Sequence, residues 1–254
     1  MHEPLTPPSV LLFDVNETLL DIAPLHKAVA DVLLDDHAAK LWFTTMLQYS
    51  LVMTVSNQYA SFGDIGAAVL QMLARNCDVV LKTADAKQVL SVIRTLPPHP
   101  DVRPALDRLK SRGIRLATLT NSSQEVAEAQ MRHADLDGFF ERILSVEQPR
   151  HFKPHRAVYD WAAGEMGVAP SECMLVAAHG WDVAGAKWAG LRAAFIARPG
   201  QQMFPLAETP EIDAADLIGF AEKLITGSAN EVETATASLA VNSSRRERDG
   251  SFPG

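Results

Sequence analysis

The sequence is poor in cysteine and lacks long apolar runs. Its 254 residues include only Cys77 and Cys173, too few for a disulfide framework or a cysteine metal cluster. No apolar segment reaches the roughly 20 residues that a membrane-spanning helix needs. The N-terminus, Met1-His2-Glu3-Pro4, shows no basic stretch followed by an apolar one, as a secretory signal would. These absences favour a cytoplasmic protein without a membrane partner.

Positive charge is also scarce. The chain has 23 Lys and Arg against 31 Asp and Glu, a formal net charge of -8. Non-specific binding of nucleic acid requires a basic surface, so we expect no nucleic-acid partner. The composition is otherwise that of an ordinary globular enzyme, with 47% hydrophobic and 21% charged residues. The length suits one large domain, or a core with an insert.

The order of apolar segments predicts an α/β fold. Val10 to Phe13 is a short apolar run that ends at an acid, as in a central parallel strand. After residue 100, predicted strands and helices alternate, which indicates a parallel sheet with helices on both faces. The predicted strands are 114–119, 142–146, 174–178 and 191–196, the last clear one. The predicted helices are 102–112, 124–133, 155–166 and 183–188.

Two stretches depart from this alternation. Apolar residues in 23–95 recur at helical spacing and show no strand pattern, which predicts a helical insert. Pro97-Pro98-His99-Pro100 forms a stiff boundary after it. Residues 227–254 are rich in Ser, Ala, Asn and Glu, so we expect a mostly disordered tail.

Polar residues follow the predicted strands. The carboxyl ends of parallel strands in a doubly wound sheet meet at one crevice, so these side chains are expected to share a small volume. An ammonium there would lower the pKa of a neighbouring carboxyl and keep it ionised. An ionised, partly desolvated carboxylate can attack carbon or phosphorus and form a covalent ester. The residues concerned are Asp14, Thr120, Asn121, Lys153, His179 and Asp182.

Each of these residues also has a purely structural interpretation. Asp14 alone could cap a strand end, and Asp182 could cap a helix that begins at Val183. Thr120 and Asn121 are common turn residues. It is their combined order along the chain that favours a catalytic site over separate structural roles.

That order resembles the haloacid dehalogenase superfamily over about residues 9–225. The L-2-haloacid dehalogenase branch is closest, because of the stretches at 136–140, 145–146 and 152–159 and a helical cap directly after the first motif. The resemblance implies a Rossmann-like core, residues 9–22 and 97–226, with an inserted helical cap, residues 23–96. The motifs that carry it are Phe13-Asp14-x-x-x-Thr18, Leu119-Thr120-Asn121, Lys153-Pro154 and Gly180-Trp181-Asp182-x-x-Gly185-Ala186.

The resemblance also implies an activity. Asp14 would displace a leaving group from C2 of a small carboxylic acid with inversion, and water would then hydrolyse the ester to a 2-hydroxy acid. Lys153 would hold Asp14 ionised and Asp182 would position or activate the water. Relatives of this branch are often homodimers. Matching functional positions are Thr18, Thr120, Asn121, Lys153, Tyr159 and Asp182.

The residue at position 16 indicates whether Asp14 attacks carbon or phosphorus, and here it is Asn16. Phosphatases of the superfamily need an acid two residues after the nucleophile to protonate the leaving alcohol, and an amide cannot do this. They also bind magnesium through several carboxylates, and no second acid follows Asp182 in the next turn. The sequence therefore predicts displacement at carbon without a metal or another cofactor.

The chain departs from the dehalogenase pattern at four places. It has Asn16 for an aromatic residue, Glu17 for glycine, Phe43 for an arginine after Leu-Trp, and Ala177-Ala178-His179 where the pattern has Ser-x-Asn. The arginine helps to cradle the departing halide, so its absence leaves open a cationic leaving group, as in the related azetidine-2-carboxylate hydrolases. A metal-dependent phosphatase and a non-catalytic binding protein are the further alternatives. We predict that the substrate contacts Asn16, Glu17, Trp42, Phe43, Thr120, Asn121, Tyr159 and His179.

Overall fold

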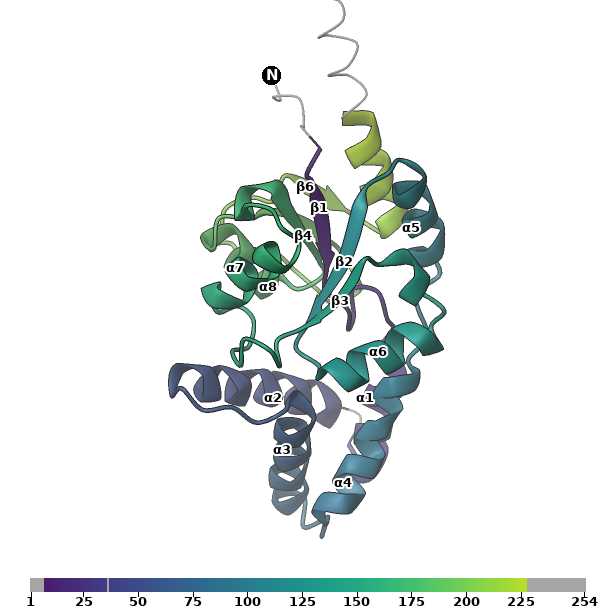
Figure 1. Ribbon diagram of the computed structural model, residues 1–254. Helices are drawn as coiled ribbons and strands as arrows, with labels where there is room; N and C mark the ends of the chain where they lie inside the picture. Colours follow the sequence, from purple (N-terminus) through teal and green to yellow (C-terminus); the bar gives the residue numbers. More distant parts are fainter. Residues whose placement is uncertain (1–6, 36, 228–254) are drawn as a thin grey trace, which may run out of the picture.

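A six-stranded sheet forms the centre of the computed structural model, which describes residues 7–35 and 37–227 (Figure 1). All its strands are parallel, in the order β3-β2-β1-β4-β5-β6, which confirms the predicted α/β, Rossmann-like fold class. The predicted disordered tail lies outside the described residues apart from Gly227. The strands are β1 (Val10–Phe13), β2 (Arg115–Thr120), β3 (Arg142–Ser145), β4 (Cys173–Ala177), β5 (Arg192–Ile196) and β6 (Ile212–Ala214).

β1 is the central strand because it is apolar on both faces. All four of its residues are buried, and it pairs with β2 on one side and β4 on the other. The strand order reverses between β1 and β4. This switch point is where ligands bind in open α/β sheets, in the crevice beyond the carboxyl ends of the strands. Asp14 directly follows β1 at this point.

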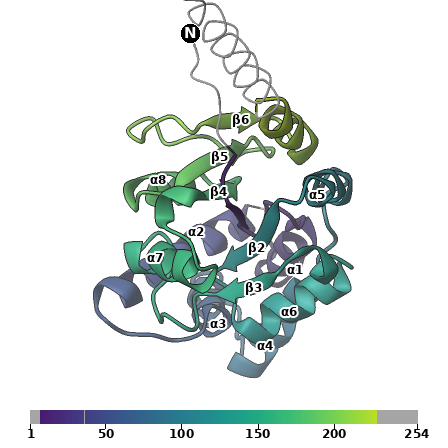
Figure 2. The same ribbon diagram turned by 45° about the horizontal axis from the view of Figure 1, so that its top comes forward.

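Helices cover both faces of the sheet. α5 (Val102–Ser111) and α6 (Gln124–His133) lie on one face, and α7 (Arg156–Glu165) and α8 (Gly180–Trp188) on the other, as both ribbon views show (Figures 1 and 2). The short 3₁₀ helices η2 (Asp137–Phe139) and η3 (Pro170–Glu172) lie in connecting loops.

The predicted insert is helical in the described residues. Its elements are α1 (Ala23–Leu33), α2 (Ala38–Val55), α3 (Phe62–Asn76), α4 (Thr83–Leu90) and the 3₁₀ helix η1 (Ser91–Thr95). The α-helices gather beyond the carboxyl edge of the sheet, so that α2 faces the strand ends (Figure 1). The Trp42 indole of α2 donates to the Gly66 carbonyl of α3, 2.9 Å away. We propose that these helices form the cap; the boundaries at 23 and 96 stay a prediction.

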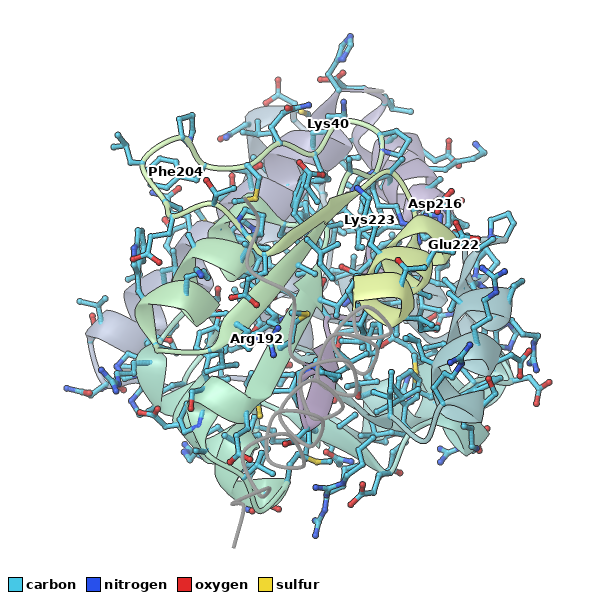
Figure 3. The ribbon with its side chains drawn as sticks, turned by 90° about the horizontal axis from the view of Figure 1, so that it is seen from above. Lys40, Arg192, Phe204, Asp216, Glu222 and Lys223 are labelled. Carbon is cyan, nitrogen blue, oxygen red and sulfur yellow. The ribbon has the colours of Figure 1, made fainter. Side chains whose placement is uncertain are left out.

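Three details differ from the sequence-based prediction. α8 begins at Gly180, not Val183, so Asp182 lies in its first turn and is not its N-cap. Residues 212–214 add a sixth strand, too short to leave a clear apolar run. A further helix spans 217–227 and carries Glu222, which Figure 3 labels. Glu222 pairs with Arg108 of α5 at 2.6 Å.

No helix in the described part of the chain is both long and apolar enough to cross a membrane.

Candidate active site

Asp14 is a buried carboxylate that hydrogen bonds surround. Its backbone N–H still joins the sheet through the Val176 carbonyl, so the end of β1 fixes its position. Lys153 Nζ donates to Oδ1 at 2.8 Å, and Thr18 Oγ1 donates to Oδ2 at 2.7 Å. Burial alone would raise the pKa of Asp14, but the charges and hydrogen bonds of Lys153 and His179 outweigh it and hold that pKa well below its usual range. Asp14 is therefore ionised, as a nucleophile requires.

Lys153 joins the two carboxylates of the site. Its ammonium contacts Asp14 Oδ1 and, at 2.6 Å, Asp182 Oδ2, and it also donates to the Leu119 carbonyl at 2.9 Å. Burial would lower the pKa of Lys153, but the charges of both carboxylates raise it above its usual value. The loop after β3 thus provides a fixed positive charge between the ends of β1 and β4.

Thr18 is oriented as a hydrogen-bond donor. The backbone N–H of Ala178 donates to Thr18 Oγ1 at 2.9 Å, so the hydroxyl hydrogen is free to point at Asp14. The pair joins the turn after β1 to the turn after β4. Thr18 therefore lies where the sequence predicted a functional residue, in contact with the nucleophile.

His179 lies between two carboxylates. Its Nδ1 is 3.2 Å from Asp14 Oδ2 and its Nε2 is 2.6 Å from Glu17 Oε2. Burial lowers the pKa of His179, but the hydrogen bonds and charges of Asp14 and Glu17 outweigh it and raise the pKa to about 10. His179 is thus an imidazolium at neutral pH, a second cation beside the nucleophile.

The Asn16 side-chain amide is hydrogen-bonded through both its nitrogen and its oxygen. Its Nδ2 donates to Ser122 Oγ at 3.3 Å, and its Oδ1 accepts from Gln130 Nε2 at 2.8 Å. The position that carries the acid of a phosphatase is therefore a structural amide linking the turn after β1 to α6. Whether it contacts the substrate stays a prediction.

The remaining predicted residues support the loops. Asn121 Oδ1 accepts from the Lys153 backbone N–H at 3.0 Å, and Thr120 Oγ1 accepts from the Ser122 N–H at 3.2 Å. The Tyr159 hydroxyl donates to Asp182 Oδ1 at 2.6 Å. Burial is the main cause that raises the pKa of Asp182, with the charge of Asp14 adding to it and that of Lys153 opposing. The predicted role of Asp182 toward water stays a prediction.

Two cavities flank the site, and Phe43 lines both. The larger, of about 760 Å³, lies between α1, α2 and the loops after β1, β4 and β5, and its wall includes Glu17 and His179. The other, of about 440 Å³, runs along α2 and α3 and includes Trp42. The rings of Phe43 and His179 stack with centroids 6.2 Å apart. Phe43 therefore fills the space beside the imidazolium.

Sequence reasoning missed several residues near the site. Arg198 NH2 donates to the Thr18 carbonyl at 2.9 Å and its NH1 pairs with Asp101 at 2.8 Å, while Gln201 Nε2 donates to Glu17 Oε1 at 3.2 Å. Arg198 and Gln201 follow β5, so the strand-end rule that selected Asp14 could have found them. Gln130 lies on the buried side of a helix, and no sequence signal reveals its partner.

Groups of three or more His, Cys, Asp or Glu side chains able to hold a metal ion are absent from residues 7–35 and 37–227.

The chain matches the family model of the haloacid dehalogenase-like hydrolases over residues 8–190. It is 30% identical over 194 residues to an (S)-2-haloacid dehalogenase of Burkholderia cepacia, covering 74% of this chain and 83% of that protein. It is 29% identical over 207 residues to a haloacetate dehalogenase of Moraxella sp. (strain B), covering 79% and 91%.

Solved structures have the same fold. The L-2-haloacid dehalogenase of Xanthobacter autotrophicus with chloropropionic acid covalently bound superposes with a TM-score of 0.80 at 22% identity, over 85% of this chain and 98% of that one. A dehalogenase with an intermediate complex superposes with a TM-score of 0.76 at 27% identity, over 85% and 96%.

Proposed function

Because this chain belongs to the haloacid dehalogenase-like hydrolases, we propose that it is a 2-haloacid dehalogenase that substitutes at C2 of a small carboxylic acid. The family resemblance drawn from the motifs is confirmed by the match to the family model. In the proposed reaction, Asp14 displaces the halide and forms an aspartyl ester. Water then hydrolyses this ester and releases the 2-hydroxy acid.

The observation that carries the proposal is the environment of Asp14. Asp14 is 5% exposed, and its carboxylate is ionised and held by the Lys153 ammonium on one oxygen and the Thr18 hydroxyl on the other. A fixed, desolvated carboxylate with a neighbouring cation is suited to nucleophilic attack. Asn16, bound to Ser122 and Gln130, offers no acid for a leaving alcohol. This chemistry supports attack at carbon.

The named relatives favour dehalogenation over the alternatives. Proteins described as 2-haloacid or haloacetate dehalogenases match 74–82% of the chain at 28–30% identity. The names of these relatives do not favour ring opening of azetidine-2-carboxylate or a non-catalytic role. The missing cap arginine does not leave the site without positive charge, because the Lys153 ammonium contacts Asp14.

A single-turnover experiment in ¹⁸O-labelled water tests the mechanism. With enzyme in excess over L-2-chloropropionate, the hydroxyl oxygen of the first product should come from Asp14, and ¹⁸O should remain in the Asp14 carboxylate. Chloride release with ¹⁸O directly in the product would contradict the ester. L-azetidine-2-carboxylate is the competing substrate, and its turnover without any chloride release from haloacids would replace the proposed activity.

Three further expectations remain proposals. A homodimer would be consistent with exposed apolar side chains along α2, of which Val55 is 81% and Leu41 56% exposed. A cytoplasmic setting and the absence of a nucleic-acid partner rest on composition alone. Sedimentation of the purified chain tests the dimer.

A further inference from the structure

His179 is held as a cation in a fixed orientation. Both of its ring nitrogens face carboxylate oxygens, Asp14 Oδ2 at 3.2 Å and Glu17 Oε2 at 2.6 Å. Carboxylate oxygens on both sides of the ring are the arrangement expected of an imidazolium, which donates from both nitrogens. The rings of Trp181 and Phe43 stack on the imidazole at 5.2 and 6.2 Å, which fixes its plane.

The two oxygens of Asp14 are not equivalent. Oδ2 accepts from Thr18 and His179, whereas Oδ1 accepts from Lys153. Each carboxylate oxygen has two in-plane lone-pair sites. The contacts of the described residues therefore use both sites of Oδ2 and leave one on Oδ1. Oδ1 is the oxygen free to attack carbon, and Oδ2 then becomes the carbonyl oxygen of the ester.

We propose that His179 and Thr18 form the oxyanion hole for hydrolysis of the Asp14 ester, and that Glu17 keeps His179 protonated while the ester exists. The inference rests on the proposed function, because it assigns donors to the second step of that reaction. It does not follow from the family pattern, in which asparagine and glycine stand at the positions of His179 and Glu17.

The step balances as ester hydrolysis. Water attacks Asp14 Cγ, the C=O electron pair moves onto Oδ2, and the negative charge forms where Thr18 and His179 donate. Collapse restores the C=O bond and breaks the bond between Cγ and Oδ1. Oδ1 leaves as the hydroxyl oxygen of the 2-hydroxy acid and keeps one proton of the water, and the second proton goes to solvent. The water oxygen becomes the new carboxylate oxygen of Asp14.

Glu17 matters most in the intermediate. In the free enzyme both Asp14 and Glu17 raise the pKa of His179, to about 10. Formation of the ester removes the negative charge of Asp14, and Glu17 is then the carboxylate left in contact with the imidazolium. Glu17 is thus a positioning residue. Its backbone has φ of 63°, a left-handed conformation that strains a non-glycine residue, and such strain is common at functional sites.

Replacing His179 should separate the two chemical steps. In His179→Asn, a neutral donor remains but the charge is lost, so we expect ester hydrolysis to slow by about 10- to 100-fold. The first equivalent of chloride should still be released within about threefold of the wild-type rate, because Lys153 contacts the attacking oxygen. Rapid-quench chloride measurement and intact-protein mass spectrometry then show a burst and an accumulating ester. His133→Asn, at an exposed histidine ending α6, is the matched control and should show neither.

Glu17→Gln should reproduce this pattern because it removes the charge that holds the imidazolium. The double variant Glu17→Gln/His179→Asn should hydrolyse the ester no more slowly than His179→Asn alone, since both changes act through one cation. A merely structural role would add the two losses and slow both steps. Glu17→Gly adopts a φ of 63° without strain, so it tests the same point if the glutamine variant does not fold.

Three outcomes decide the matter. Slow ester decay with a normal chloride burst in both variants supports the inference. A chloride burst slowed as much as ester decay, or ester decay left unchanged, overturns it and leaves the proposed function standing. Failure of the wild-type enzyme to release chloride or form an ester overturns the proposed function, and the inference with it.

Discussion

At the scale of single residues, Asp14 has a different hydrogen-bond donor on each oxygen. Lys153 and His179 both donate to it, so an amide at this position would turn an NH₂ group toward a cation. The Asp14→Asn variant therefore loses the nucleophile and gains a donor–donor conflict. We expect no detectable turnover and no ester by intact mass. Asp160→Asn, an exposed acid of α7, is the control and should keep full activity. Residual turnover by Asp14→Asn above about one hundredth of wild type would contradict the assignment.

The structure changes the effect that we expect from replacing Phe43 with arginine. From the sequence alone, Phe43→Arg would simply place an arginine where the dehalogenase pattern has the one that cradles the halide. Phe43 stacks on His179, however, so a guanidinium there would face an imidazolium. The like charge would lower the pKa of His179 and weaken its bonds to Asp14 and Glu17.

Phe43→Arg alone should therefore reduce chloride release. Phe43→Arg/His179→Asn removes the conflicting charge and restores the residues of the dehalogenase pattern at both positions. We expect this double variant to release its first equivalent of chloride faster than Phe43→Arg alone, by about tenfold, in rapid-quench measurements with L-2-chloropropionate. Equal rates for the two variants would show that the charges do not interact.

At the scale of elements, Gly185 explains why the last motif needs a glycine. A Cβ on Gly185 would lie 2.2 Å from Pro154 Cβ and 2.9 Å from the Tyr159 hydroxyl. α8 therefore packs directly on the loop that carries Lys153. Gly185→Ala should push this loop away from β4, lower the unfolding free energy by about 1–3 kcal/mol and reduce turnover at least tenfold.

Urea denaturation and chloride release measure the two effects of Gly185→Ala. Gly164→Ala is the control, because a Cβ at this position of α7 meets no atom within 4 Å. Alanine also has the higher helix propensity, so this control should be neutral or slightly stabilising. Normal activity in Gly185→Ala would show that the loop tolerates the displacement.

Elements could be predicted where the pattern was long and regular. The boundaries of α6 agree with the sequence, and β1 was recognised from four apolar residues before an acid. The start of α8 was missed because Gly180 and Trp181 are poor helix signals, and the strand at 212–214 was missed because only two of its three residues are buried. The position of Asp14, Lys153 and Asp182 after predicted strands was enough to predict that they lie close together. The pairing of Glu17 with His179 could not be predicted, since it depends on the left-handed backbone conformation of Glu17, for which the sequence gives no signal.

At the scale of the whole molecule, the buried imidazolium makes stability depend on pH. The pKa of His179 rises from 6.5 to about 10 on folding. A group whose pKa is raised on folding stabilises the protein fully below its unfolded pKa, and this contribution is lost as pH rises through the folded pKa. His179 should therefore contribute roughly a few kcal/mol below pH 6.5 and progressively less from pH 6.5 to 10.

Other buried groups act outside this window or partly overlap it. The pKa values of His26 and His99 are lowered, mainly by burial, so these two residues change the stability only at pH values below 6.5. Burial raises the pKa of the Cys173 thiol from 9.0 to about 11, so the folded state resists its ionisation and loses stability above pH 9. The interval from pH 6.5 to 9 therefore reports mainly on His179.

Urea unfolding of the full chain across this interval measures the effect. The wild-type unfolding free energy should fall steadily from pH 6.5 to 9, whereas that of Glu17→Gly/His179→Asn should stay nearly constant. The double variant is the suitable reference because it removes the cation together with one of its two anionic partners, and it leaves no strained residue at position 17. Parallel curves for the two proteins would mean that His179 does not gain its proton affinity on folding. The oxyanion hole would then lack the charge of His179. In that case, the loss of this charge could not explain any slower ester hydrolysis in the His179→Asn variant.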